Sequence, residues 1–591
     1  MKVVVIGAGT SGLVTCKSLL DAASADFPFD PVVLDQEADI GGTFRYRSYE
    51  NATMVSSKQL TSFSDFRLPL DHPDHLTLEE YVAYLHAYCA HFGIADRIHL
   101  ESKVVHVARR LGGGHVVSYV TKGASGEWDS TLRTIDATHI ALCTGLHVVP
   151  SIPDIPGIEH VTLNGDSTHA VYHSIEYKSR KELAGRRVMV LGTGETGMDL
   201  AYEAAKAGAK EVVLCSRSGF LSFPKALNDF EIFGFQFKSK TSSVPFDSLI
   251  TNLGETAYVH PWIASSHIRW FVSDFVIKRL LWFLTGTQAG CNQWVGELEP
   301  DRLGRAYVFL NKSHKAMPYI NRPYRSRPAF LEYMSRYIDP PEDMPPQTDF
   351  VVDLAPFPTH FLPSGRAVFP LSKRKDAVRM RDRDVRPEVV IYATGYRQEF
   401  SFLDKAGGYA TPGNADVRNV VKSGDESVAF IGFVRPGVGA IPPISEMQAF
   451  WWISLLKGQV KKPLRPPHYH LLVKDTARIK YGVDHSSYMS TLAKDIGAAP
   501  GLWALWREYG THVAVCYSFG AAFTTFYRLV GPFRSPLAPE IVKTELWDTI
   551  QRRGLLGNFV IGLVPMVFYL ALNGIALVLE LVLTLGGLVR V

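Results

Sequence analysis

Two segments of this 591-residue chain share one pattern, in which a short apolar strand runs into a glycine-rich turn and then a helix. The strands span residues 2–6 and 187–191, and the turns have the spacing Gly-x-Gly-x-x-Gly. Such a turn brings backbone amides and a helix N-terminus against a pyrophosphate. We therefore predict an α/β fold with two Rossmann-like dinucleotide-binding domains. The turn residues proposed to bind cofactor are Gly7, Gly9, Ser11, Gly12, Gly192, Gly194, Glu195, Thr196 and Gly197.

The residues that end the second strand of each unit indicate different nucleotides. Asp35 ends the strand at 31–34, and a carboxylate there accepts hydrogen bonds from ribose hydroxyls and repels a 2′-phosphate. This favours FAD in the first unit. In the second unit Ser216 and Arg217 occupy the equivalent place, where a guanidinium binds a phosphate in a bidentate manner. This favours NADPH over NADH.

A flavin site and an NADPH site on one chain imply hydride transfer to the flavin. The six cysteines are far apart and form no CxxC pair that could receive the electrons, so molecular oxygen is the expected acceptor. The spacing of the cysteines also predicts a reduced, cytosol-facing protein without a metal site. The net charge of +4 is too small and dispersed for nucleic-acid binding.

The sequence resembles the flavin-containing monooxygenases over roughly residues 1–460. Besides both glycine turns, four segments carry the resemblance: 39–44 with Gly41, Gly42 and Thr43; 56–66; the ATGY sequence with Thr394, Gly395 and Tyr396; and 442–448. The family oxygenates soft nucleophiles through a flavin hydroperoxide. The resemblance thus implies an NADPH- and O2-dependent flavoprotein that acts on a small molecule, and it adds these glycine, threonine and tyrosine residues to the cofactor site.

The linker fingerprint of the family, FxGxxxHSxxY, aligns with residues 167–177. His173, Ser174 and Tyr177 are retained, whereas Ser167 and His169 replace the leading Phe and Gly. Baeyer–Villiger relatives usually end this motif in Trp, so Tyr177 favours oxygenation of nitrogen or sulfur, as in dimethylaniline monooxygenases. Baeyer–Villiger oxidation of a ketone is the alternative.

The segment similar to the active-site loop of the family contains Ser56, Ser57 and Lys58, which could orient flavin or substrate. The family usually has Asn before this segment, and this chain has Val55. That Asn donates a hydrogen bond near the reactive face of the flavin, so its loss bears on the lifetime of the flavin hydroperoxide. A second alternative is therefore a non-catalytic flavin-binding membrane protein.

The predicted organisation places the first part of the FAD-binding domain at 1–160, the NADPH-binding domain at 161–345 and the second part of the FAD-binding domain at 346–460. We expect the strands at 389–393 and 428–431 to rejoin the first sheet. The basic residues at 373–386 alternate with Asp and predict a solvated loop. The aromatic-rich stretch at 267–285 predicts a packed amphipathic helix.

A helical extension is predicted at 461–550, followed by a hydrophobic membrane segment at 555–589. That segment exceeds the ~20 residues needed to span a bilayer, and Asn558, Asn573 and Glu580 interrupt its apolar run. A tilted span, a re-entrant pair and an interfacial anchor are all compatible with it, and a buried core helix is the alternative. Because Arg552 and Arg553 precede it, we expect the catalytic part to face the cytosol, at the endoplasmic reticulum.

Overall fold

The structure is a computed structural model of the chain. It describes residues 1–123, 125–163, 170–222, 225–227, 230–232, 235–237, 244–250, 259–266, 268, 310–311, 313, 315–316, 319–320, 350–460, 464, 468–471 and 481–586. The predicted helix at 267–285, apart from residue 268, lies outside the described residues, as do Ser167, His169 and Cys291.

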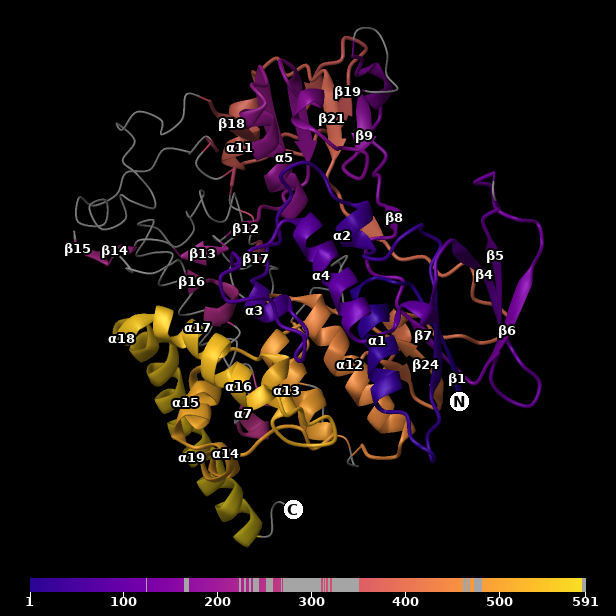
Figure 1. Ribbon diagram of the computed structural model, residues 1–591. Helices are drawn as coiled ribbons and strands as arrows, with labels where there is room; N and C mark the ends of the chain where they lie inside the picture. Colours follow the sequence, from indigo (N-terminus) through magenta and orange to yellow (C-terminus); the bar gives the residue numbers. More distant parts are fainter. Residues whose placement is uncertain are drawn as a thin grey trace.

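A six-stranded sheet carries the first glycine turn, in the strand order β23-β24-β7-β1-β2-β3 (Figure 1). Its central strands are parallel, as the predicted βαβ unit requires. The elements are β1 (Lys2–Ile6), α1 (Thr10–Asp21), β2 (Asp30–Leu34), β3 (Ile98–His99), β7 (His139–Leu142), β23 (Val421–Lys422) and β24 (Asp425–Phe430).

Both faces of this sheet are covered, which explains why its strands are continuously apolar. Val3 and Val5 pack into the core that contains α1, α4 (Leu78–His91) and α12 (Ile441–Leu456). Val4 and Ile6 pack on the opposite side, against an antiparallel sheet of β4 (Ser102–Arg109), β5 (His115–Thr121) and β6 (Arg133–Ala137). The capping box predicted for α4 is present, with Thr77 and Glu80 bonded reciprocally.

The second glycine turn belongs to a five-stranded sheet with the order β18-β11-β10-β21-β9, which lies above the first sheet in Figure 1. Alternate residues of β10 again enter separate cores on the two faces. The elements are β9 (Val171–His173), β10 (Arg187–Leu191), α5 (Glu195–Lys206), β11 (Glu211–Ser216), β18 (Val352–Pro356), α11 (Lys375–Met380) and β21 (Val389–Tyr392).

Two expectations about the late part of the chain are wrong. The strand at 389–393 does not rejoin the first sheet, because β21 pairs with β10 and with β9. Residues 352–392 thus contribute two strands to the second sheet, although they fall in the segment predicted as the second part of the FAD-binding domain. Residues 375–380 form the helix α11 instead of a solvated loop, and Ala377 and Met380 are buried. The strand at 428–431 does rejoin the first sheet, through β24 and β7.

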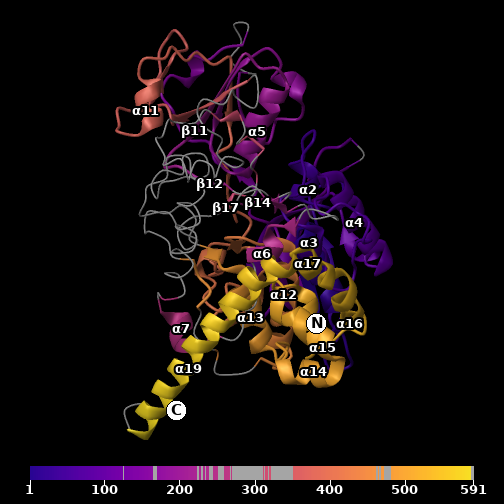
Figure 2. The same ribbon diagram turned by 90° about the vertical axis from the view of Figure 1, so that its left-hand side faces the viewer.

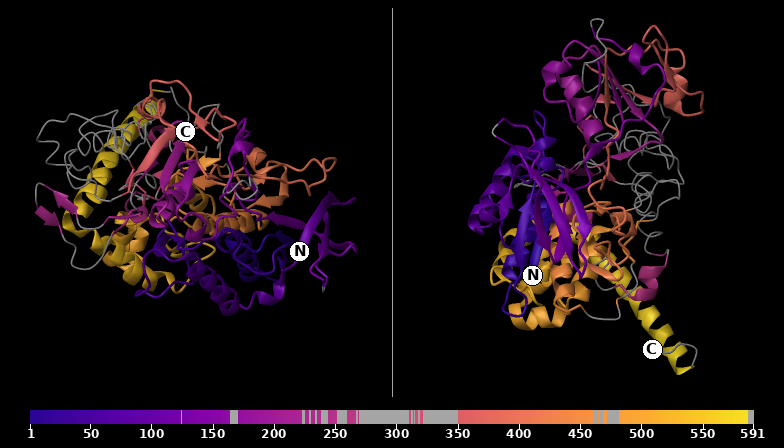
Figure 3. Two further views of the ribbon diagram at one scale, coloured as in Figure 1. Left: turned by 90° about the horizontal axis from the view of Figure 1, so that it is seen from above. Right: turned by 90° about the vertical axis from the view of Figure 1, so that its right-hand side faces the viewer.

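The sheets are connected by an antiparallel pair formed by β8 (Val149–Pro150) and β22 (Tyr396–Arg397). One strand leaves the first sheet and the other returns from the second, so these two crossings run side by side. In the right-hand view of Figure 3 the second sheet stands apart from the first, above a narrower connection. The glycine turns therefore belong to separate sheets joined at this connection.

The C-terminal extension packs into the same core as α1 and α12. Its elements are α13 (His485–Asp495), α14 (Leu502–Tyr509), α15 (Thr511–Phe519), η8 (Thr524–Arg528), α16 (Ala538–Ile541), η9 (Val542–Leu546) and α17 (Trp547–Arg552). Two buried ion pairs fasten it: Arg67 donates to both carboxylate oxygens of Glu545 at 2.8 and 2.7 Å, and Arg418 donates to Asp495 at 2.6 and 2.9 Å. The extension is thus integral to the first unit.

The chain then continues through α18 (Gly554–Gly557) and η10 (Asn558–Leu563) into α19 (Val564–Leu585), which projects from the body in Figure 2. This helix has 22 residues and a mean hydropathy of 2.2, so it is long and apolar enough to cross a membrane. The main chain and imidazole of His260 bond to two polar side chains of α19, Asn573 at 2.7 Å and Glu580 at 3.1 Å. His260 precedes α7 (Pro261–Ser265), which packs on α19.

Candidate active site

Each glycine of the first turn has its own structural reason. Gly7 has a φ of 112°, and a Cβ there would lie 2.6 Å from the carbonyl oxygen of Cys143. A Cβ on Gly12 would lie 1.8 Å from the oxygen of Gly7. By contrast, the nearest described atom to a Cβ on Gly9 would be the Cα of Gly42, at 3.8 Å. Gly7 and Gly12 therefore serve the turn and the helix–strand packing, whereas Gly9 leaves the backbone accessible.

The second turn repeats this division. Gly192 has a φ of 124°, with a hypothetical Cβ 2.3 Å from the oxygen of Ala393, and a Cβ on Gly197 would lie 1.9 Å from the oxygen of Gly192. A Cβ on Gly194 would meet no described atom within 4 Å. Packing within the chain requires the outer glycines but does not require Gly194. The open space at Gly194 fits a pyrophosphate on the N-terminus of α5, where Glu195 and Thr196 form the first turn.

The carboxylate of Asp35 lies beside the first turn. It accepts hydrogen bonds from the backbone N–H of Ala8 at 2.5 Å and of Glu37 at 2.8 Å. Burial raises the pKa of Asp35, while these two amide bonds act in the opposite direction. The geometry holds Asp35 at the end of β2, which is the position from which a carboxylate reaches a ribose.

The equivalent position of the second unit is basic. Ser216 is buried at the end of β11, and Arg217 is exposed beyond it, with its guanidinium 5.9 Å from the ring centre of Phe357. Arg374 supports this strand end by donating to the carbonyl oxygens of Ser216 and Arg217, at 3.2 and 2.6 Å, and to the hydroxyl of Ser216 at 3.0 Å. Arg374 therefore holds the end of β11 in place, and Arg217 on that strand end is accessible to a ligand.

The segments at 41–43 and 442–448 come together at the first turn. Gly41 donates its N–H to the oxygen of Ala8 at 3.1 Å, and Thr43 begins α2 (Thr43–Tyr46) beside Gly42. The hydroxyls of Ser11 and Ser445 are 2.8 Å apart and buried. The fold thus places both of these distant motifs beside Gly7, Gly9 and Gly12.

The ATGY sequence and the linker fingerprint meet at the connection between the sheets. His173 Nε2 donates to the oxygen of Gly395 at 3.1 Å, and its Nδ1 accepts the N–H of Ile175 at 3.3 Å, which fixes one neutral tautomer. The ring of His173 lies 4.9 Å from that of Tyr396, and Thr394 donates its hydroxyl to the oxygen of Ser151. Burial lowers the pKa of His173.

Two further fingerprint residues are buried near these contacts. Ser174 donates its N–H to the oxygen of Tyr392 at 3.0 Å. Tyr177 is fully buried with its ring 5.7 Å from that of Tyr49. The fingerprint residues therefore fasten β9 to β21. Both strands belong to the second sheet.

The side chains of the predicted active-site loop are engaged within the protein. The hydroxyls of Ser56 and Thr61 are 2.7 Å apart. Ser57 caps α3 (Lys58–Thr61) through its hydroxyl. Lys58 is only 2% exposed, and its three N–H groups donate to the carbonyl oxygens of residues 69, 70 and 72. Val55 is half-buried. Lys58 thus has a full set of protein partners, which favours a structural role in the loop.

A buried guanidinium atom near the first turn is left for a ligand. The short helix α2 begins directly after Gly42, and Arg47 follows its last residue. The Nε of Arg47 is buried and has no hydrogen-bond partner among the described residues. One terminal nitrogen of Arg47 reaches only the oxygen of Val148, at 3.5 Å. Together with the open space at Gly9 and Gly194, this unpaired donor fits anionic dinucleotides bound near the connection between the two sheets.

Comparison with known proteins gives the family. The family model described as flavin-binding monooxygenase-like matches residues 1–258 and 376–582. The chain belongs to this family. It is therefore a flavin-dependent monooxygenase, which is an oxidoreductase. The match extends to residue 582, so the resemblance to the family reaches well beyond residue 460, where the motifs of the sequence end.

Relatives of this monooxygenase cover most of its length. It is 41% identical over 562 residues to monooxygenase ptmN of Penicillium ochrochloron, covering 94% of this chain and 90% of the relative. It is 24% identical over 583 residues to flavin-containing monooxygenase 5 of Cavia porcellus, covering 93% and 92%. The solved S-allyl-L-cysteine S-oxygenase of Allium sativum has the same fold, with a TM-score of 0.51 at 16% identity over 84% of this chain and 88% of that one.

Sequence reasoning missed two charged groups of this monooxygenase. Arg374 lies in the basic stretch read as solvated, and no local pattern separates it from its neighbours. Glu446 accepts hydrogen bonds from the N–H and hydroxyl of Ser64, the latter at 2.6 Å. Burial and the neighbouring Asp65 raise the pKa of Glu446 to about 7, and Arg528 of the C-terminal extension opposes this. The extension thus reaches the segment that follows the active-site loop.

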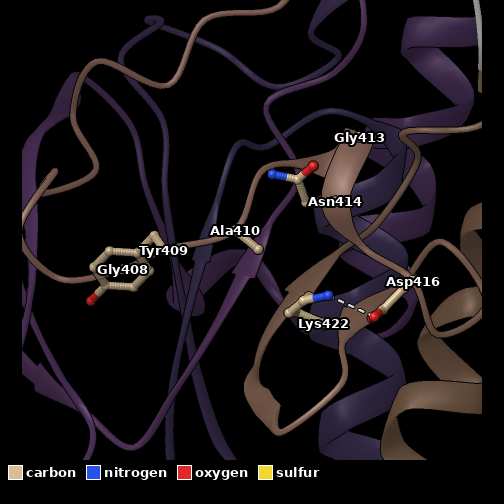
Figure 4. A pocket seen from close by; sticks show the side chains of 7 residues that line it. All are labelled: Gly408, Tyr409, Ala410, Gly413, Asn414, Asp416 and Lys422. Carbon is tan, nitrogen blue, oxygen red and sulfur yellow. Dashed lines mark hydrogen bonds and ion pairs between the residues drawn. The ribbon is translucent and has the colours of Figure 1, made fainter.

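A surface cavity of about 490 Å³ lies elsewhere on this monooxygenase. Gly408, Tyr409, Ala410, Gly413, Asn414, Asp416 and Lys422 line it. Figure 4 shows the ion pair of Lys422 with Asp416, which spans 2.6 Å at one side of the cavity. None of the lining residues belongs to either glycine turn, to the ATGY sequence or to the active-site loop, so we do not assign this cavity to the oxygenation site.

Proposed function

We propose that the chain is an NADPH- and O2-dependent monooxygenase that holds FAD on the first glycine turn and NADPH on the second. The observation that carries this assignment is the contrast between the two strand ends, Asp35 beside one turn and Arg217 beside the other. The carboxylate suits the ribose of FAD, and the exposed guanidinium suits the 2′-phosphate of NADPH. The bound flavin would accept a hydride and activate O2.

The residues proposed to hold FAD are Gly7, Gly9, Ser11, Gly12, Asp35, Gly41, Gly42 and Thr43. Those proposed to hold NADPH are Gly192, Gly194, Glu195, Thr196, Gly197, Ser216 and Arg217. The linker residues His173, Ser174, Tyr177, Thr394, Gly395 and Tyr396 would join the two sites. In this arrangement the protein contributes orientation and exclusion of water, and it needs no nucleophilic side chain.

We propose nucleophilic nitrogen or sulfur as the atom that receives oxygen. Tyr177 stands where Baeyer–Villiger relatives usually have Trp, and relatives of this chain include dimethylaniline monooxygenase [N-oxide-forming] 2 of Oryctolagus cuniculus, 24% identical over 564 residues.

Product analysis tests the class of substrate. We expect the purified protein, given NADPH and O2, to convert members of an amine and thioether panel into products 16 mass units heavier, with matching NADPH consumption. Because N-oxides, S-oxides and lactones all gain one oxygen, the panel also includes ketones, with chromatographic standards for each product. Lactones or esters from the ketones, with amines and thioethers unchanged, would establish the Baeyer–Villiger alternative.

We further propose that α19 anchors the protein to a membrane, at the endoplasmic reticulum with the catalytic part in the cytosol. Most of the large apolar side chains of α19 are exposed, which a water-soluble surface disfavours. His260 pairs with Asn573 and Glu580, so these two polar side chains of the helix have a partner inside the protein. Arg552 and Arg553 are largely buried by contacts to Asp74, Phe519 and Ser248, so their value as topological signals is smaller than the sequence indicates.

Truncation tests the anchor. A chain ending at residue 557 retains α17 and the buried arginines and loses residues 558–591, which include η10 and α19. We expect it to move from the membrane pellet to the soluble fraction and to keep its flavin. A full-length protein that is soluble without detergent would contradict the anchor, and loss of flavin on truncation would show that the tail serves the fold instead.

A further inference from the structure

Two charged side chains from the segment that follows β11 hold the active-site loop of the first unit. Lys225 Nζ donates to the hydroxyl of Thr53 at 2.8 Å and to the oxygen of Met54 at 3.4 Å. Asp247 Oδ2 accepts the N–H of Ser57 at 2.7 Å. These contacts lie on either side of Val55 and Ser56, so they bracket the part of the loop where this chain departs from its family.

The two charged residues belong to one small structure. β13 (Ala226–Leu227) pairs antiparallel with β16 (Val244–Pro245), and Phe246 donates its N–H to the oxygen of Lys225 at 2.9 Å. Lys225 and Asp247 therefore sit together at one end of this two-stranded ribbon. Lys225 presents a donor to the hydroxyl of Thr53 and the carbonyl oxygen of Met54, and Asp247 presents an acceptor to the amide of Ser57. This complementarity distinguishes the contact from an accidental meeting of surfaces.

The Asp247 contact is fully buried, and the Lys225 contact is partly buried. Asp247 is fully buried at the start of α6 (Asp247–Ile250), and Lys225 is half-buried. A charged group taken out of water and bonded to uncharged polar groups is costly to disturb, because removal of either partner leaves a buried polar group unsatisfied. Lys225 and Asp247 therefore constrain the loop more strongly than an exposed pair would.

We propose that Lys225 and Asp247 are positioning residues that fix the Val55–Ser56 turn for oxygen transfer. The inference rests on the proposed function. Val55 cannot donate a side-chain hydrogen bond at the flavin face, so this chain depends on the placement of the loop backbone and of Ser56 to exclude water and to order the site. A loosened loop lets turnover become uncoupled: both electrons of NADPH then reduce O2 to H2O2, and no oxygen enters the substrate.

The charge of Lys225 makes the contact sensitive to pH. Burial lowers the pKa of Lys225 to about 8; Lys315 lowers it further, and Asp199 on α5 opposes both. Lys315 and Asp199 lie 3.7 Å apart, and Asp247 stands on the same ribbon end as Lys225. As the pH rises through about 8, the ammonium becomes a neutral amine, and its bonds to Thr53 and Met54 lose their charge assistance.

The test is the coupling ratio, product formed per NADPH oxidised, in detergent-solubilised full-length protein with an amine or thioether that the wild type oxygenates. We expect Lys225→Met and Asp247→Asn each to lower the ratio about fivefold or more and to raise H2O2, while the anaerobic rate of flavin reduction by NADPH stays within about twofold. Lys315→Met is the matched control, because it removes a nearby ammonium that has no bond to the loop.

The dependence of the coupling ratio on pH distinguishes a positioning role of Lys225 from general support of the fold. We expect wild-type coupling to fall above about pH 8, Lys225→Arg to retain coupling there, and Lys315→Met to shift the fall to higher pH. Unchanged coupling in both Lys225→Met and Asp247→Asn would overturn the inference. The inference would also be overturned if the coupling ratio depended on pH in the same way in Lys225→Arg as in the wild type. If the wild type forms no oxygenated product at all, the proposed function fails instead, and the two failures remain distinguishable.

Discussion

Gly194→Ala is expected to raise the KM for NADPH at least tenfold while leaving the thermal unfolding of the protein unchanged. A Cβ at this position meets no described atom within 4 Å, so the chain itself tolerates a methyl group. The methyl would instead occupy the space through which the backbone approaches the pyrophosphate. A tenfold effect corresponds to about 1.4 kcal/mol, a modest loss for a displaced phosphate contact. Steady-state kinetics and a melting curve measure the two quantities.

Gly197→Ala supplies the contrast within the same turn. Its Cβ would lie 1.9 Å from the oxygen of Gly192, so α5 must move away from β10. We expect a loss of roughly 3 kcal/mol or more, seen as a lower melting temperature, in addition to weak NADPH binding. Equal melting temperatures for the two variants would contradict the division of roles between these glycines. An unchanged KM in Gly194→Ala would remove NADPH from this turn.

Arg217→Ala is expected to reduce the preference for NADPH over NADH by about 30-fold to 100-fold. The guanidinium is exposed and is placed by a strand end that Arg374 supports, so its removal takes away a charge-assisted bond to the 2′-phosphate without disturbing the core. Such a bond contributes about 2–3 kcal/mol. The ratio of kcat/KM for the two nucleotides measures the effect, since NADH turnover should change little.

The matched control is Lys210→Ala. Lys210 is exposed on the same unit, just before the start of β11, so this change removes the same charge from the opposite end of the strand. We expect its nucleotide preference to equal that of the wild type. An Arg217→Ala protein that keeps its preference for NADPH would place the 2′-phosphate elsewhere.

Local patterns predicted the parts of the fold that depend on neighbouring residues. The glycine turns, the strands that lead into them and the capping box of α4 are each specified within about a dozen residues, and the structure has all of them. The pairing of strands, by contrast, depends on residues that are far apart in the chain. β21 and the second half of β24 are both short apolar runs, and only the three-dimensional arrangement decides that one pairs with β10 and the other with β7. The sequence alone therefore assigned β21 to the wrong sheet.

The same limit applies to the candidate site. Spacing predicts the glycine turns, Asp35 and Arg217 as parts of the nucleotide sites, because short segments of chain contact a nucleotide. Lys225 and Asp247 are about 170 and 190 positions from the loop they contact, and no motif marks either residue. Lys58 shows a different limit of local sequence patterns. A lysine within an active-site motif suggests chemistry, yet its three donors serve loop carbonyls, which only coordinates reveal.

Anaerobic stopped-flow spectroscopy shows whether the flavin of this protein is reduced by NADPH in preference to NADH. The purified protein is mixed with NADPH or with NADH at equal concentration, and the flavin absorbance near 450 nm is followed. We expect the protein to contain FAD, to be bleached rapidly by NADPH and much more slowly by NADH, and to lose this difference in Arg217→Ala. A protein that binds flavin but is not reduced by NADPH, or that is reduced equally fast by both nucleotides, would contradict this expectation.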